Sequence, residues 1–148
     1  FNESENDWES SQVHENFKTK EISSIRSTKI DYLPNIFNYK NYDTIIKLDI
    51  EGNEIKAIKG GLKFIEKTSP IIIIEFSKYI FDKKSNIEYL NLFLLNYNYS
   101  IYSTEAKKMS LDQIIIKLSQ LTRRYKTIGN YYLIKNSSSN LNTFLSNG

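Results

Sequence analysis

Two apolar runs dominate the pattern along the chain, and both are rich in β-branched residues. They cover residues 44–50 (TIIKLDI) and 70–76 (PIIIIEF) and are bounded by polar or turn residues. Runs in which both the odd and the even positions are apolar are typical of strands covered on both faces, as in a parallel sheet. The residues between them that recur at roughly helical spacing are Ile55, Ile58, Leu62 and Ile65. The pattern therefore predicts a β-α-β unit.

The boundaries of this unit follow from single residues. Asn53 stands where an N-cap is expected before the helix. Gly60 and Gly61 interrupt the helix and cost about 1 kcal/mol each relative to Ala, so we expect it to be short or bent there. Upstream, residues 27–33 (STKIDYL) are β-tolerant and stop at Pro34, which predicts a short strand or extended segment.

Two capping-box patterns predict further helices. Ser85 with Glu88, and Ser110 with Gln113, each precede an apolar stretch at helical spacing. A strand is expected between these helices at residues 99–103.

The end of the chain predicts one last strand and then a tail. Gly129 precedes the apolar segment 131–135 (YYLIK), which reads as the last strand. Residues 137–148 are rich in Ser and Asn and are expected to form a disordered polar tail.

Composition limits the function classes. The chain of 148 residues, 40% hydrophobic, can bury one core, so we expect a single domain over residues 1–136 before the tail. Its net charge of +3 is scattered, which does not indicate nucleic-acid binding. No apolar run approaches the roughly 18 residues of a membrane span. The lack of cysteine excludes disulfides and fits a cytoplasmic location.

Candidate chemistry gathers at the carboxyl ends of the two predicted buried strands, where open α/β sheets bind ligands. Asp49, Glu51 and Gly52 follow the first strand, and Glu75 ends the second. A structural role competes with chemistry at each position. Asp49 or Glu51 would accept N–H bonds from the following turn, Gly52 would supply a positive φ, and Glu75 would pair with a lysine.

The other polar features have ordinary interpretations. His14, the only histidine, lies in the acidic stretch 1–16 and is expected to be solvated. Arg123, Arg124 and Lys126 are expected to form a solvated helix end rather than a phosphate site. No metal site is expected.

The string IKLDIEGNE (residues 46–54), followed by Gly60, Gly61 and the proline-led strand PIIIIE (residues 70–75), resembles the FkbM methyltransferase pattern I-K-[IL]-D-[IV]-E-G-x-E. Upstream, Ser10 and Ser11 in WESSQ match the family's Ser-rich stretch. The segment 27–33 matches T-x-x-L-D-x-L with one substitution, and the likeness extends roughly from Asp7 to Asn136.

The resemblance implies a Rossmann-like class I fold with strand order 3-2-1-4-5-7-6. On this mapping residues 44–50 form strand 4, residues 70–76 form strand 5, and a C-terminal strand pair follows. The resemblance implies methyl transfer from S-adenosylmethionine, commonly to a hydroxyl oxygen. We expect a small-molecule or glycan acceptor, for example a sugar or a secondary metabolite.

The site residues follow from this mapping. Asp49 and Glu51 are the candidate catalytic residues, and Gly52, Glu54 and Glu75 are the candidate substrate-binding residues. A carboxylate there would orient an acceptor hydroxyl and take its proton.

The chain opens at Phe1, and its glycines form no cofactor-binding turn. We therefore expect the main cofactor-binding elements to precede Phe1, in an incomplete fold that belongs to a longer chain. Residues 1–148 alone are expected to be inactive. Strand 4 would then be an open edge, through which a homo-oligomer could form. The alternative to an enzyme is a truncated, non-catalytic interaction module that uses this edge or the acidic N-terminal stretch.

Overall fold

The computed structural model describes residues 28–35, 43–122 and 126–146, with helices and strands that confirm an α/β fold. The elements follow in the order η1 (Ile30–Asn35), β1 (Ile45–Leu48), α1 (Glu54–Lys59), α2 (Leu62–Thr68), β2 (Ile71–Ser77), α3 (Lys78–Phe81), α4 (Lys84–Asn96), β3 (Tyr99–Tyr102), β4 (Lys108–Met109), α5 (Leu111–Ser119), β5 (Thr127–Lys135) and α6 (Ser139–Ser146).

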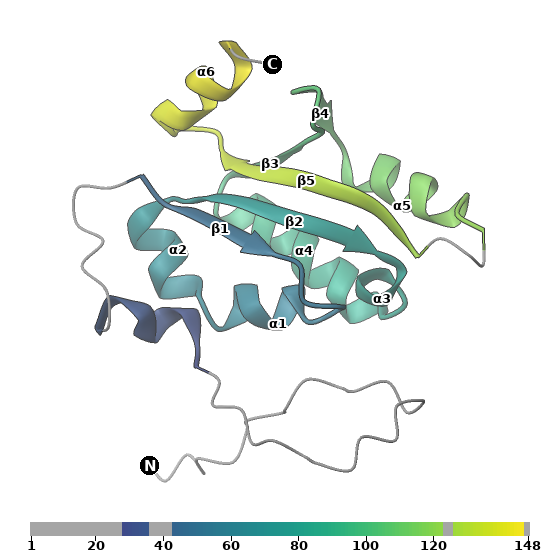
Figure 1. The fold of residues 1–148 in the computed structure, drawn as a ribbon, viewed down its shortest axis with the longest axis horizontal. Coiled ribbons are helices and arrows are strands. Elements are labelled where there is room, and N and C mark those ends of the chain that lie inside the picture. Colours follow the sequence, from purple (N-terminus) through teal and green to yellow (C-terminus); the bar gives the residue numbers. More distant parts are fainter. Residues whose placement is uncertain (1–27, 36–42, 123–125, 147–148) are drawn as a thin grey trace, which may run out of the picture.

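The described strands form one sheet in the order β1-β2-β5-β3-β4 (Figure 1). β1 and β2 are parallel and in register, with Ile45 beside Ile71 and Leu48 beside Ile74, and α1 and α2 connect them. This confirms the predicted β-α-β unit. β5 runs antiparallel to both of its neighbours, β2 and β3. Among the described residues β1 pairs only with β2, so its other side is a sheet edge.

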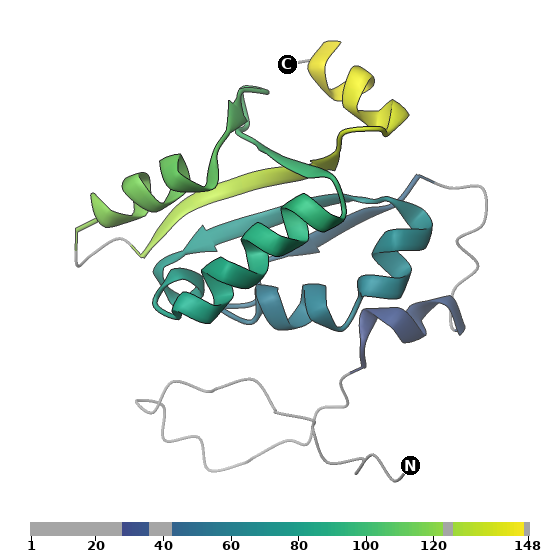
Figure 2. The same cartoon turned by 180° about the vertical axis from the view of Figure 1, so that it is seen from behind.

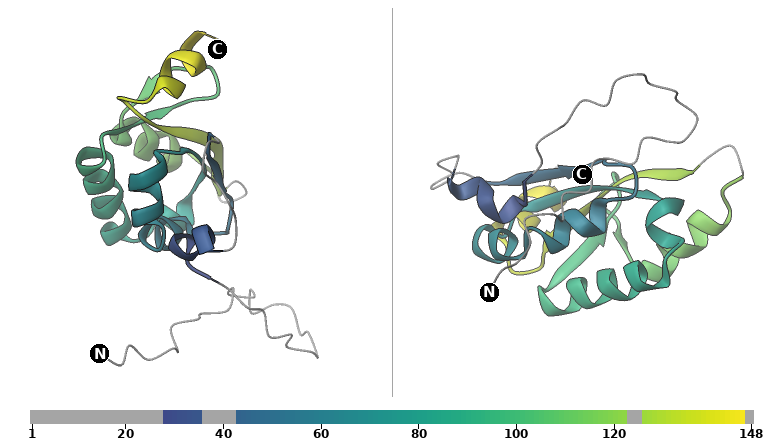
Figure 3. Two further views of the ribbon diagram at one scale, coloured as in Figure 1. Left: turned by 90° about the vertical axis from the view of Figure 1, so that its left-hand side faces the viewer. Right: turned by 90° about the horizontal axis from the view of Figure 1, so that it is seen from below.

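One face of the sheet carries the core. Helices α1, α2 and α4 lie against it, as Figures 2 and 3 show from behind and from the side. Side chains from alternate positions of the strands fill it, among them Ile72, Ile74, Phe76 and Leu133, each fully buried. α5 adds Ile114 and Leu118 to the same cluster.

The opposite face, here the open face, turns toward the viewer in Figure 1. Strand alternation assigns to it the side chains of Ile45, Lys47, Ile71, Ile73, Glu75, Asn130 and Tyr132. Within the described part of the chain, α6 covers this face only at one end. There the Phe144 ring packs 4.9 Å from Tyr132 and 5.8 Å from Tyr102, measured between ring centroids.

Packing explains two departures from the sequence predictions. The segment 27–33, predicted as a short strand or extended segment, belongs from Ile30 onward to the 3-10 helix η1. Asp31 docks it on the chain by accepting a hydrogen bond from Phe64 N–H (2.9 Å) while its own N–H donates to Gly60 C=O (3.0 Å). The tail predicted as disordered contains α6, which is held by the aromatic contacts of Phe144.

The glycine pair divides the predicted helix into α1 and α2, as expected. Ile30 of η1 sits so close to Gly61 that an added Cβ there would lie 2.9 Å from Ile30 Cβ. Asn53 is the N-cap residue of α1, as predicted, but its side chain makes no capping bond. Its amide group instead donates to Ile50 C=O over 3.3 Å.

The two capping-box patterns have different outcomes. Ser110 and Gln113 form the reciprocal bonds at the start of α5, as predicted. Ser85 does not cap α4, which already begins at Lys84. Lys83 takes the N-cap position, and Asn86 N–H donates to Lys83 C=O at 2.9 Å, so that Ser85 falls inside the first turn.

Candidate functional site at the carboxyl ends of β1 and β2

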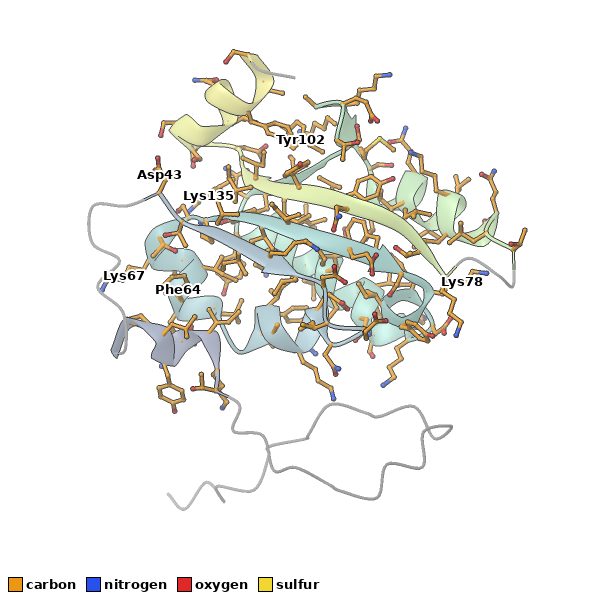
Figure 4. The ribbon with its side chains drawn as sticks, viewed as in Figure 1. Asp43, Phe64, Lys67, Lys78, Tyr102 and Lys135 are labelled. Atoms are coloured by element: carbon orange, nitrogen blue, oxygen red, sulfur yellow. The ribbon has the colours of Figure 1, made fainter. Side chains whose placement is uncertain are left out.

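The candidate residues meet at one edge of the sheet because β1 and β2 run parallel and in register. The turn after β1 and the start of α3 after β2 both emerge there. β5 begins at the same edge, where Thr127 pairs with Ser77. In Figure 4 Lys78 marks this edge, and Asp43 and Lys135 lie at the opposite end of the sheet.

Asp49 and Glu75 stand side by side on neighbouring strands. Leu48 pairs with Ile74, and Asp49 and Glu75 are the next residues of the two chains. Parallel strands lie about 5 Å apart, so the two carboxylates flank one small region of the open face. Asp49 Oδ2 accepts a hydrogen bond from Lys47 Nζ at 2.8 Å, with both side chains about half exposed. This ion pair keeps the Asp49 side chain on the open face.

Asn130 extends this pair into a row of three polar side chains. It is the register partner of Glu75 on β5 and is exposed, whereas Glu75 is half-buried. Neither side chain forms a hydrogen bond or ion pair with the described residues. The lysine expected to pair with Glu75 is therefore not found there. No local pattern in the sequence pointed to Asn130, because its place depends on the antiparallel register of β5.

The turn after β1 has a left-handed backbone at two successive residues. Glu51 has φ 54° and Gly52 has φ 94°. Glu54 Oε1 accepts hydrogen bonds from the N–H groups of Ile50 (3.0 Å) and Gly52 (3.2 Å). The backbone N–H groups of the turn are thus satisfied by Glu54 and not by Asp49 or Glu51, the residues considered for this role. Asp49 and Glu51 remain exposed.

Tyr79 and Lys126 complete the edge and were not predicted as site residues. A Cβ on Gly52 would lie 2.8 Å from Tyr79 Cβ, so Tyr79 covers the turn closely. Lys126 Nζ donates to Tyr79 Oη at 2.5 Å. This hydrogen bond, and the negative charge of Glu51 to a smaller extent, raise the pKa of Lys126 above its usual value. Lys126 therefore links β5 to Tyr79 at this edge and lies near the charge of Glu51.

Two buried side-chain oxygens at this edge have no hydrogen-bond partner among the described residues. They are Glu54 Oε2 and Ser77 Oγ, in residues that are 1% and 4% exposed. Native structures retain few such groups, and functional sites are among the places that do. The edge therefore combines exposed carboxylates with unsatisfied buried polar atoms.

The remaining expectations concern the histidine, the arginine pair, a metal site and a membrane span. His14, Arg123 and Arg124 lie outside the described residues. In the described ranges no three acidic or histidine side chains gather closely enough to hold a metal ion. The same ranges contain no helix that is long and apolar enough to cross a membrane.

Comparison with known proteins agrees with the sequence motif. The family model of the methyltransferase FkbM domain matches residues 1–101, which include β1, the turn with Glu54, and β2. Searches of curated proteins and of solved structures gave no match. Because the matched region covers more than half of the chain and contains the carboxylate-bearing edge, the chain belongs to the FkbM methyltransferase domain family.

Proposed function

We propose that the protein takes part in methyl transfer from S-adenosylmethionine to a hydroxyl oxygen of a sugar, glycan or secondary metabolite. The observation that carries this proposal is the placement of Asp49 beside Glu75 at the carboxyl ends of β1 and β2, on the open face. Family membership supports methyl transfer in general. The carboxylates support a hydroxyl acceptor, because they can accept its hydrogen bond and its proton.

The order of the strands supports the mapping onto a Rossmann-like methyltransferase sheet. β1, β2, β5 and β3 are neighbours in the order expected for strands 4, 5, 7 and 6. β5 is antiparallel to the strands on either side of it. On this mapping Asp49 follows strand 4, where the acceptor would meet the methyl donor.

The described residues fit the acceptor side of this reaction better than a whole cofactor site. S-adenosylmethionine supplies a methyl group on a cationic sulfonium, and the carboxylates of Asp49 and Glu75 suit a cation nearby. A glycine-rich cradle for its nucleoside is not found in the described ranges. Gly52 offers no open space for one, because Tyr79 fills the position of a Cβ.

The roles of the side chains follow from their contacts. Lys47 holds the Asp49 carboxylate through the 2.8 Å ion pair. Asp49 would accept the proton of the acceptor hydroxyl as its oxygen becomes the nucleophile. Glu75 and Asn130 would bind neighbouring hydroxyls of the acceptor, Glu75 as an acceptor of hydrogen bonds and Asn130 as a donor. Holding the hydroxyl in line with the methyl group is the larger part of the expected acceleration.

The test is transfer of a radiolabelled methyl group from S-adenosylmethionine to a panel of sugars and hydroxylated metabolites, measured on a chain extended upstream of Phe1 by the expected cofactor-binding elements. The unchanged protein and every variant below are compared in this extended form. We expect Asp49→Asn to lower turnover by about 10²-fold or more without loss of fold. Asp82→Asn is the matched control, because Asp82 is an exposed aspartate at the end of α3. Failure of the unchanged protein to methylate any acceptor, or full turnover by Asp49→Asn, would contradict the proposal.

The exposed edge of β1 favours a second candidate function, an interaction module. Ile45 on this strand is 63% exposed, and Asp43, Ile45 and Lys47 alternate along one side. An antiparallel second copy centred on Ile45 would place each Asp43 opposite a Lys47. Light scattering tests this function. Ile45→Lys should dissociate a dimer that depends on the edge, and a monomeric unchanged protein would exclude this pairing.

A further inference from the structure

Glu54 differs from the other acidic residues of the motif in its burial. It is 1% exposed, whereas Asp49 and Glu51 are exposed. It is the first residue of α1, and its side chain turns back over the preceding turn instead of toward the open face. A residue so buried does not present its carboxylate to an acceptor in solution, which argues against the substrate-binding role expected for it.

The hydrogen bonds of Glu54 determine the shape of the turn. One oxygen, Oε1, accepts from both Ile50 N–H and Gly52 N–H, the residues that flank Glu51. Glu51, with φ 54°, has a conformation that side-chain-bearing residues adopt only when surrounding contacts hold them there. The bonds to Glu54 supply those contacts from one side of the turn.

Tyr79 confines the same turn from the other side. Its Cβ occupies the space next to Gly52 so closely that no larger residue fits without a shift. Gly52 therefore lies between the Glu54 carboxylate and Tyr79. Ile50, the other residue bound by Glu54, directly follows Asp49. A change in the turn would consequently move the Asp49 carboxylate and also Glu51.

We infer that Glu54 is a positioning residue, whose buried carboxylate fixes the turn after β1 and so aims Asp49 and Glu51 at the acceptor. This inference rests on the proposed function for what the turn is aimed at, but the hydrogen bonds themselves can be tested without it. The second oxygen, Oε2, has no partner among the described residues. The positioning role therefore depends on the single acceptor atom Oε1.

Two substitutions separate the acceptor atom from the charge. Glu54→Gln keeps a carbonyl oxygen that accepts both N–H groups, whereas Glu54→Ala removes it. Amide hydrogen exchange, measured by NMR on the full chain, reports on the turn directly. In Glu54→Ala we expect exchange at Ile50 and Gly52 to be at least about tenfold faster, with buried strand amides such as Ile74 unchanged. Glu54→Gln should retain protection.

Kinetics then test the positioning of Asp49. We expect Glu54→Ala to lower kcat by about 10-fold to 100-fold, with KM for S-adenosylmethionine little changed. The effect should be much smaller in an Asp49→Asn background, because both changes act on one catalytic group. A purely structural residue would show additive effects. Additive effects, unchanged amide exchange in Glu54→Ala, or a Glu54→Gln variant as impaired as Glu54→Ala would each overturn the inference.

The two proposals fail in different ways. If the unchanged protein methylates no acceptor while Ile50 and Gly52 lose protection only in Glu54→Ala, the proposed function is wrong and the control of the turn by Glu54 stands. If methyl transfer is found and protection does not depend on Glu54, the positioning role is wrong.

Discussion

Tyr79 occupies the space into which a side chain on Gly52 would point, with its Cβ 2.8 Å from the ideal position of a Gly52 Cβ. Gly52 also has φ 94°, a conformation that is unfavourable for other residues. Two independent constraints, one on the backbone and one on the space, therefore act at the same glycine of the motif.

Gly52→Ala should be strongly destabilising, and Gly129→Ala is its matched control. Gly129 has φ 89° but nothing lies within 4 Å of an added Cβ, so it measures the backbone constraint alone, about 1–2 kcal/mol. Urea unfolding should show a larger loss for Gly52→Ala. Tyr79→Ala should not rescue it, because the contact is with Cβ. Equal losses for both glycines would contradict the close contact.

Asn130→Ala should weaken use of the acceptor without changing the affinity for the donor. Loss of one neutral hydrogen bond, about 1 kcal/mol, corresponds to about a fivefold rise in the acceptor's KM. Asn91→Ala, on the exposed side of α4, is the control. Steady-state kinetics with the best acceptor found would measure the difference. Equal behaviour of the two variants would remove Asn130 from the acceptor site.

Alkaline pH should destabilise the fold through Tyr99. Burial raises the pKa of Tyr99 above its usual 10.0, and its hydroxyl donates to Pro70 C=O at 3.0 Å. The folded protein therefore holds this proton more tightly than the unfolded chain. The contribution is complete below pH 10 and is lost as the pH rises above it.

Circular dichroism against pH tests this expectation. Tyr99→Phe should lose about 1 kcal/mol at neutral pH, through the missing hydrogen bond, and show a weaker decline in stability above about pH 10. Burial also raises the pKa of Tyr89, so Tyr89→Phe should blunt the decline in the same direction. Its hydroxyl has no partner among the described residues, so this change should cost less at neutral pH. If both variants lost stability at alkaline pH as the unchanged protein does, the loss could not be assigned to Tyr99 and Tyr89.

Ser110→Ala should cost about 1 kcal/mol of stability, because Ser110 caps α5 through the Gln113 N–H. Ser85→Ala should be close to neutral, since Ser85 is exposed inside the first turn of α4 and makes no capping bond. Thermal unfolding of the two variants gives a direct comparison of one sequence pattern with two structural outcomes. A cost at Ser85 equal to that at Ser110 would contradict the assigned start of α4.

This comparison shows which parts of the fold the sequence could predict. Structure that depends on a few neighbouring residues could be predicted. The two apolar runs form β1 and β2, and the glycine pair divides the helix. The Ser85 prediction failed because α4 begins at Lys84, with Lys83 at its N-cap. Residues 30–33 were predicted to be extended but are helical, because Asp31 is held by Phe64, 33 residues away in sequence.

The candidate site was predictable to the same degree. The motif pointed to Asp49 and Glu75, and parallel pairing in register brings them together. Asn130 reaches the site through the register of β5, and Tyr79 reaches it through the short helix α3, which follows β2 directly. Neither contact is visible in the motif itself. The burial of Glu54 was also hidden, since a third acid in a polar string looks no different from the other two.

The docking of η1 has a mechanical consequence for the motif. Asp31 is bonded to Phe64 N–H and to Gly60 C=O, and these contacts lie at the junction of α1 and α2. A pull on the chain from the N-terminal side of Thr28 therefore loads this junction before the tension reaches β1. The force enters α1 and α2, and the first residue of α1 is Glu54, which holds the turn after β1. The docking of η1 is therefore mechanically linked to the turn that follows Asp49.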